Sequence, residues 1–208
     1  MIHSPAKRLV LTTLAAVLTA STLSACFPLV AGGMASGALL ATDRRTSGAQ
    51  LEDEGIELRA VSRLRSAFGE RVHVNVTSYN RQVLLTGEVG SAQDKTAVEQ
   101  LVAKVENTQT VVNELGVMAG STLGQRSSDT LVTGRVKAAM IDARDLQFNA
   151  FKVVTERGTV YLMGRVTQRE ADRATEVART TGDVLKVVRV FEVLTEAELA
   201  RLQPSANK

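Results

Sequence analysis

Few residues of this chain could take part directly in catalysis or metal binding. It has a single cysteine, Cys26, and two histidines, of which His73 is the only one after position 3. Zinc sites and nucleophile–base pairs need several such side chains close together. The sequence therefore predicts no catalytic residue, no metal site and no cofactor. His73 alternates with Val72 and Val74, so we expect it on the solvated face of a strand.

Three consecutive acidic residues, Glu52, Asp53 and Glu54, could serve acid–base chemistry or hold a cation. They precede apolar residues at helical spacing, and negative side chains are stabilised near the positive end of a helix dipole. We therefore interpret them as the start of a helix, and we predict that the protein is not an enzyme.

The first thirty residues predict export. Lys7 and Arg8 are followed by an apolar run that is short and rich in Thr and Ser, which is typical of a secretory signal rather than a membrane span. The run ends in LSAC at residues 23–26, which resembles the bacterial lipobox at all four positions. That resemblance implies removal of residues 1–25 and acylation of Cys26 with chains such as palmitate. No Asp follows Cys26, and the resemblance then implies the outer membrane, with the protein facing the periplasm.

The two halves of the remaining chain differ in charge. Residues 51–118 contain 7 Lys/Arg and 10 Asp/Glu, whereas residues 126–194 contain 12 and 9. If one half faces an anionic surface, it should be the second. Aromatic residues make up 3% of the chain and Trp is absent, so we predict no nucleic-acid partner.

The two halves also repeat one another. VLLTGEV at 83–89 recurs as VYLMGRV at 160–166, and weaker matches precede and follow it. Each copy predicts the order α-β-β-α-β. In the first copy Glu57, Val61, Leu64 and Phe68 fall at i, i+4, i+7 and i+11, which places them on one face of a predicted helix. A glycine inside each repeated strand, Gly87 or Gly164, is typical of a bulge or a close packing contact. Thr167 and Glu170 have the spacing of a capping box.

This order predicts a hairpin followed by a crossover helix, which brings the third strand parallel to the second. We expect an α+β fold of two tandem αββαβ units, each a three-stranded mixed sheet with helices on one face. The expected boundaries are a lipidated tether at 26–50, units at 51–118 and 127–194, a linker at 119–126 and a tail at 195–208. The last strands should cover 111–117 and 187–193.

In both copies the pattern resembles the BON domain. A signal sequence, a lipobox and two such units resemble the dual-BON outer-membrane lipoproteins, and ATDRRT at 41–46 is similar to the leader of that family. The resemblance implies a role in envelope integrity, at division sites. It also implies contact with anionic phospholipid, phosphatidylglycerol, through the first helix of the second unit.

That helix carries an unusual apolar residue. With Val136 toward the core, Leu131 lies about 140° away, beside Arg135 and Ala138. A leucine next to a cation suits a bilayer surface, because the arginine meets phosphate while the leucine enters the acyl boundary. Leu131, Arg135 and Ala138 are therefore candidate phospholipid-binding residues. Ile56 holds the equivalent place in the first copy, so this position could instead pack between the units or against a partner, or have no role.

The alternative function is a periplasmic scaffold that recruits envelope proteins, with lipid contact incidental. The sequence leaves open the oligomeric state, the protein partners and the arrangement of the two units.

Overall fold

The computed structural model describes residues 43–202. The expected signal sequence, Cys26 and most of the expected tether lie outside these residues. The described part contains two successive α+β units, as the sequence predicts. The first consists of α3 (Ser47–Phe68), β1 (His73–Tyr79), β2 (Gln82–Val89), α4 (Ala92–Ala103), β3 (Thr110–Asn113) and β4 (Gly116–Val117). The second consists of α5 (Leu123–Asp142), the 3-10 helix η2 (Phe148–Ala150), β5 (Phe151–Glu156), β6 (Thr159–Thr167), α6 (Gln168–Arg179) and β7 (Lys186–Leu194), and α7 (Glu196–Leu202) follows it.

Each unit has the mixed sheet that the element order requires. β1 and β2 are antiparallel, and β3 and β4 pair in parallel with β2. β5 and β6 are antiparallel, and β7 pairs in parallel with β6 along its whole length. The strand expected at 111–117 is divided by Glu114 and Leu115, whose side chain is buried in the core. The chain nevertheless stays beside β2, because Glu114 N donates to Leu85 O at 3.0 Å.

Several helix boundaries differ from those expected. α3 begins at Ser47, where the Thr46 side chain accepts from Ala49 N, so the helix starts inside the segment expected as tether. α5 begins at Leu123, inside the expected linker, behind a capping box of Thr122 and Gln125. The predicted capping box of Thr167 and Glu170 is present at the start of α6.

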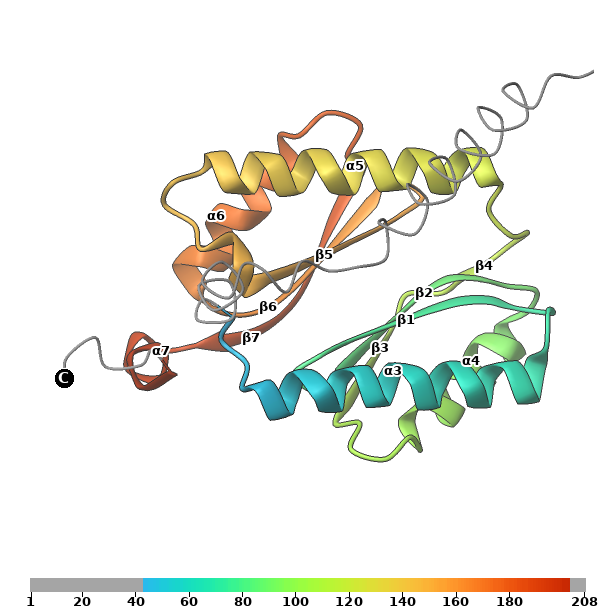
Figure 1. The fold of residues 1–208 in the computed structure, drawn as a ribbon. Coiled ribbons are helices and arrows are strands. Elements are labelled where there is room, and N and C mark those ends of the chain that lie inside the picture. The colour runs from blue at the N-terminus through green and yellow to red at the C-terminus, as the bar shows by residue number, and fades with distance from the viewer. Residues whose placement is uncertain (1–42, 203–208) are drawn as a thin grey trace, which may run out of the picture. The chain divides into compact units, whose positions relative to one another are not determined.

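The helices of each unit cover one face of its sheet and enclose an apolar core (Figure 1). In the second unit Val136 points into the core, as expected, and so do Val132 and Met140. In α3 the predicted register is right for Leu64 and Phe68, which are buried, and wrong for the preceding turns, where Asp53, Ile56 and Ala60 are buried in place of Glu57 and Val61. A shift of one residue turns a helix position by about 100°. Ile56 is 0% exposed and is therefore the counterpart of Val132, not of Leu131.

The glycines of the repeated strands allow a close approach of backbone. A Cβ added at Gly87 would lie 2.1 Å from His73 O, and one added at Gly164 would lie 2.5 Å from Ala150 O. The close packing contact expected at both positions is therefore confirmed.

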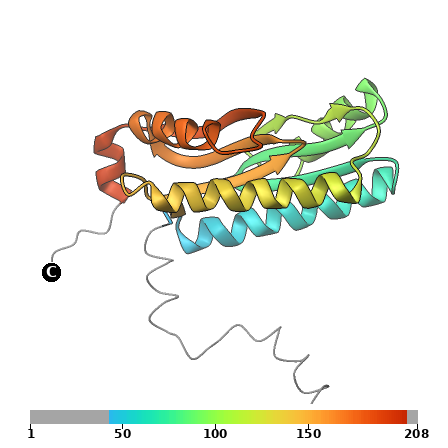
Figure 2. The same ribbon diagram turned by 90° about the horizontal axis from the view of Figure 1, so that it is seen from above.

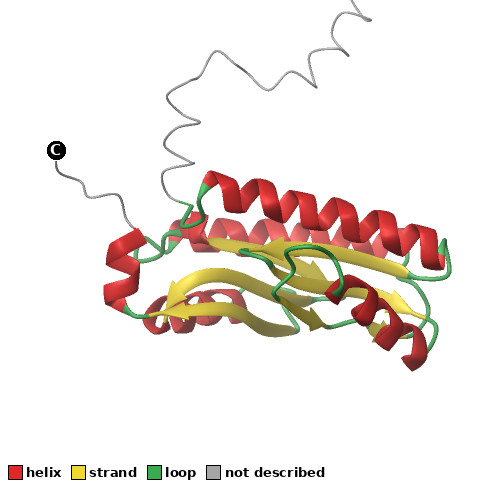
Figure 3. Ribbon diagram, turned by 90° about the horizontal axis from the view of Figure 1, so that it is seen from below, coloured by secondary structure: helices red, strands yellow, loops and turns green. Residues whose placement is uncertain are grey.

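The two units together form one compact body. Their sheets pack face to face through the faces that the helices leave open, and the helices lie outside them (Figures 1 and 3). This contact forms a third apolar cluster between the units, which consists of Tyr79, Leu84, Tyr161, Met163 and Val190. Tyr79 also donates through its hydroxyl to Ala150 O at 3.2 Å. The central strands β2 and β6 are consequently buried on both faces along most of their length.

Candidate functional site

The helix α5 lies on the outside of the second unit, with the sheets between it and α3 (Figure 1), and it is nearest the viewer in Figure 2. Its rotation is fixed from within by Val132, Val136 and Met140, and also by Asp129. The Asp129 carboxylate accepts from the backbone nitrogens of the hairpin turn at Arg157 and Gly158, both at 2.8 Å. The opposite side of α5 is thereby held toward solvent.

An uncharged, exposed stripe runs along that outward side. Leu131 is 62% exposed, and its neighbours along the stripe are apolar or small. On a helix of 100° per residue the members lie within about 80° of one another. The outer stripe consists of Leu123, Ser127, Leu131, Gly134, Ala138 and Ile141.

Cations flank the outer stripe on both sides. Arg135 and Lys137 each lie about 40° beyond one of its edges. Arg135 forms an ion pair with Asp183 in which both side chains are exposed. Lys137 has no hydrogen bond or ion pair among residues 43–202. The structure thus brings Leu131, Arg135 and Ala138 to one exposed face, and it adds Lys137, which the sequence analysis did not single out.

Packing of Leu131 between the two units does not occur. Leu131 faces solvent on the outer layer, and Ile56 lies in the core of its own unit. The apparent equivalence of the two positions came from the error in the register of α3.

His73 has a different environment from the one expected. Its Nδ1 lies 2.8 Å from Glu88 Oε2, and Arg157 Nε donates to the other carboxylate oxygen at 2.6 Å. The Glu88 side chain is 1% exposed. Burial alone would raise the pKa of Glu88, but the hydrogen bonds from His73 and Arg157 outweigh it and lower the pKa. Because Arg157 belongs to the second unit, this cluster ties the two units together.

The acidic run at 52–54 also has a different role. Asp53 lies in the second turn of α3 rather than before the helix, and it is buried. Its carboxylate accepts from Ser78 Oγ at 2.6 Å, and from Asn80 N and Arg81 N at 2.7 Å. Burial opposes ionisation, but these bonds together lower the pKa of Asp53. It therefore holds the β1–β2 turn, as Asp129 holds the β5–β6 turn.

Two consecutive arginines connect the start of the described chain to both units. We call Arg44 and Arg45 the N-terminal clasp. Arg44 donates to both carboxylate oxygens of Glu170 at 2.7 and 2.8 Å, in the second unit. Arg45 pairs with Asp53 at 2.8 Å, in the first unit, and its guanidinium lies 4.2 Å from the centre of the Tyr79 ring. Sequence reasoning singled out residues 41–46 through their resemblance to a family leader but assigned them no contact.

Within residues 43–202 no group of three or more His, Cys, Asp or Glu side chains is placed to hold a metal ion. No helix in that part of the chain is long and apolar enough to cross a bilayer.

The family model of the BON domain matches the chain twice, at residues 53–119 and 128–195. A protein of Haemophilus influenzae named outer membrane lipoprotein DolP is 35% identical over 198 residues, which cover 93% of this chain and 100% of the relative. This chain belongs to the BON-domain outer-membrane lipoproteins of the DolP type. The matched ranges cover the two αββαβ units except for the first residues of α3 and α5, so these units are its BON domains.

Two further proteins are similar to this BON-domain chain. A 21 kDa hemolysin of Actinobacillus pleuropneumoniae is 32% identical over 151 residues, which cover 72% of this chain and 78% of the relative. A solved structure of CdsD, a structural protein of the type III secretion system of Chlamydia trachomatis, covers 73% of this chain and 99% of that one. It is 12% identical with a TM-score of 0.30, which is too low to support an argument about fold.

Proposed function

We propose that this lipoprotein is non-enzymatic and binds anionic phospholipid such as phosphatidylglycerol through α5 of its second BON domain. It is held in the outer membrane by acyl chains on Cys26, and it supports envelope integrity, at division sites. The observation that carries the proposal is the outer stripe of α5, exposed and uncharged along its centre, with Arg135 and Lys137 on its flanks.

This arrangement matches the chemistry of a bilayer surface. Leu131 would leave water for the acyl boundary, which is worth about 1.5–3 kcal/mol for a fully buried leucine. Arg135 and Lys137 would each gain about 1 kcal/mol near an anionic surface. Arg135 is free to do so, because an exposed ion pair such as that with Asp183 contributes little.

Such a contact is weak for a free protein, because association costs at least about 4 kcal/mol in lost translational and rotational freedom. The acyl anchor removes most of this cost by raising the effective concentration of α5 at the membrane. Sixteen residues separate Cys26 from Asp43, and a fully extended chain of that length reaches roughly 55–60 Å. The tether is therefore long enough to let α5 reach the bilayer.

The proposal is tested with the mature chain from residue 26 carrying Cys26→Ser, which removes the anchor and leaves every described residue unchanged. Sedimentation with vesicles at low salt should show binding to mixtures of phosphatidylglycerol and phosphatidylcholine, and none to phosphatidylcholine alone. Leu131→Glu should weaken binding by at least about tenfold, since it removes the apolar contact and adds repulsion.

The matched control is Leu58→Glu, since Leu58 is 73% exposed on α3 of the first BON domain and lies outside the proposed surface. Equal binding by wild type and Leu131→Glu would refute the lipid contact, and no binding at any lipid composition would favour the scaffold function. Labelling of the exported protein with a palmitate analogue should disappear in Cys26→Ala, and labelling that persists would refute the anchor.

A further inference from the structure

A second feature of the molecule lies beside the proposed membrane surface. A cavity of about 330 Å³ opens between α5, the segment η2–β5 and the N-terminal clasp. Its volume is at the lower end of the range for small-molecule sites, which is roughly 300–1,000 Å³. The cavity volume is about ten times the volume that one water molecule occupies in liquid water, so the cavity is larger than an ordinary packing defect.

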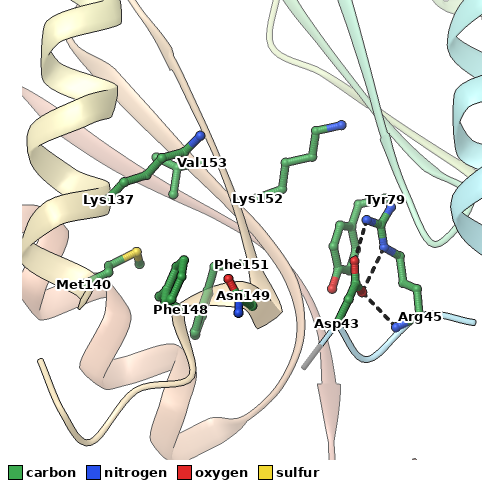
Figure 4. A pocket seen from close by; sticks show the side chains of 10 residues that line it. All are labelled: Asp43, Arg45, Tyr79, Lys137, Met140, Phe148, Asn149, Phe151, Lys152 and Val153. Atoms are coloured by element: carbon green, nitrogen blue, oxygen red, sulfur yellow. Dashed lines mark hydrogen bonds and ion pairs between the residues drawn. The ribbon is translucent and has the colours of Figure 1, made fainter. Parts of the chain in front are cut away.

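The walls of the cavity divide into an apolar part and a cationic part. Met140, Phe148, Phe151 and Val153 supply apolar surface, and all but Phe148 are buried. Figure 4 shows the side chains of Lys137 and Lys152 toward one end and Phe148 with Met140 toward the other. A pocket of this kind suits a molecule with an anionic group at one end and an apolar body at the other.

The charges that line the cavity do not cancel. Arg45 is neutralised by Asp43, with which it pairs at 2.8 Å, and by Asp53 behind it. Lys137 has no partner among the described residues. Lys152 pairs with Glu57 at 3.0 Å, but both side chains are partly exposed, and such a pair is worth at most about 1 kcal/mol. Lys152 can therefore exchange Glu57 for a more strongly binding anion.

The position of Lys137 connects this cavity to the outer stripe. The residue lies on the flank of α5, about 40° beyond Ile141 at the edge of the stripe. A lipid at the bilayer surface beneath α5 can therefore place its headgroup at the cavity while its chains stay in the membrane.

We infer that this cavity binds the headgroup of one anionic phospholipid molecule, with its phosphate at Lys137 and Lys152 and its first carbons against Phe148 and Met140. This inference deepens the proposed function, because it adds a stoichiometric site to a general surface. It also predicts selectivity, since the cationic choline of a zwitterionic lipid would meet two ammonium groups.

The test uses the mature chain with Cys26→Ser and a lipid that stays monomeric, dihexanoyl phosphatidylglycerol below its critical micelle concentration. Titration followed by amide chemical shifts should saturate at one lipid per chain, with the largest changes at Lys137, Phe148 and Lys152. Lys137→Gln should weaken this binding about tenfold, as expected for one lost charge-assisted hydrogen bond. Phe148→Ser, at a residue already 36% exposed, should weaken it as well.

The matched control is Lys186→Gln, which makes the same charge change at an exposed position of β7 outside the cavity. Equal weakening by Lys186→Gln would overturn the site. So would saturation by dihexanoyl phosphatidylcholine with equal affinity, or no saturation by either lipid. Inorganic phosphate that binds as tightly as the lipid would show a free-phosphate site and overturn the lipid assignment.

The two proposals can fail separately. Leu131→Glu should leave monomer binding unchanged, because Leu131 does not line the cavity. Vesicle binding that depends on Leu131 without saturable monomer binding would refute the cavity and leave the surface intact. The reverse result would refute the surface and leave the cavity.

Discussion

The N-terminal clasp should make the start of the folded region energetically important. Arg44 and Glu170 form a bidentate pair in which each side chain is 5% exposed. Arg44 also donates to Arg165 O at 2.8 Å. In Arg44→Met the arginine is lost, and the Glu170 carboxylate stays buried with only the bonds from Thr167.

The cost follows from leaving a buried charge without its partner. Removing one member of a buried pair typically destabilises a protein by about 3–5 kcal/mol. For a body of this size that corresponds to a fall in Tm of roughly 6–20 °C. Replacing both members is less harmful, so Arg44→Met with Glu170→Gln should cost less than Arg44→Met alone, since glutamine is neutral and can still cap α6.

The measurement is urea unfolding of the mature chain with Cys26→Ser, with Arg63→Met as the control. Arg63 lies exposed on α3 and makes one hydrogen bond, to Lys104 O at 2.8 Å, so its loss should cost less than about 0.5 kcal/mol. A loss below about 1 kcal/mol for Arg44→Met would refute the reasoning.

The pH dependence gives an independent check on the same pair. Burial would raise the pKa of Glu170, but the hydrogen bond from Arg44 and those from Thr167 outweigh it and lower the pKa. A lowered pKa stabilises the fold above the unfolded value, about 4.3 for Glu, and this stability is lost as the pH falls through the folded value. The difference between wild type and Arg44→Met should therefore be largest near pH 7 and shrink below about pH 4.

Two further predictions concern the strands. Gly87→Ala should lower the free energy of unfolding in urea by roughly 2–6 kcal/mol, because the new side chain meets a φ of 110° and a clash with backbone. The control is Gly90→Ala, which has nothing within 4 Å of the new Cβ and should change stability by less than about 0.5 kcal/mol. Similar losses for both variants would contradict the backbone strain proposed at Gly87. Burial raises the pKa of Glu156, so the stability that this group contributes is present below about pH 4.3 and is lost as the pH rises through its folded pKa. Glu156→Gln, which keeps an acceptor for Asn75, should therefore stabilise the fold near pH 7 and change it little at pH 4, and a loss of stability at pH 7 would contradict this.

The repeated pattern made most of the fold predictable. Each of three features depends on residues close together in the sequence and can therefore be derived from it. These are the apolar patterns of the repeated strands, the crossover helix and the capping box at Thr167. The register of α3 could not be predicted from the local sequence, because the apolar pattern of this helix includes Leu58 and Val61, which remain exposed. Its buried side includes Asp53, a charged residue that becomes favourable only when the β1–β2 turn supplies its hydrogen bonds.

The candidate site was predictable to a similar extent. The exposure of Leu131, Arg135 and Ala138 followed from Val136 alone, because a single inward residue sets the rotation of a helix. The cavity was not predictable, since Lys137 and Lys152 lie on different elements and meet the clasp only after the chain has folded. His73 was assigned to solvent because no sequence pattern showed that Glu88 and Arg157 would enclose it.

The sequence by itself determined the α-β-β-α-β order of each unit and the outward face of α5, since each depends on periodicity and capping within a few residues. Only the tertiary structure decided that the two sheets pack face to face and that Arg44 and Arg45 hold both domains. The contacts between the domains join residues far apart in the sequence: Tyr79 and Ala150 are 71 positions apart, and Arg44 and Glu170 are 126 positions apart. The energy of these contacts comes from burial and from complementary charges. The residues involved are brought together only after each domain has folded and formed its own surface.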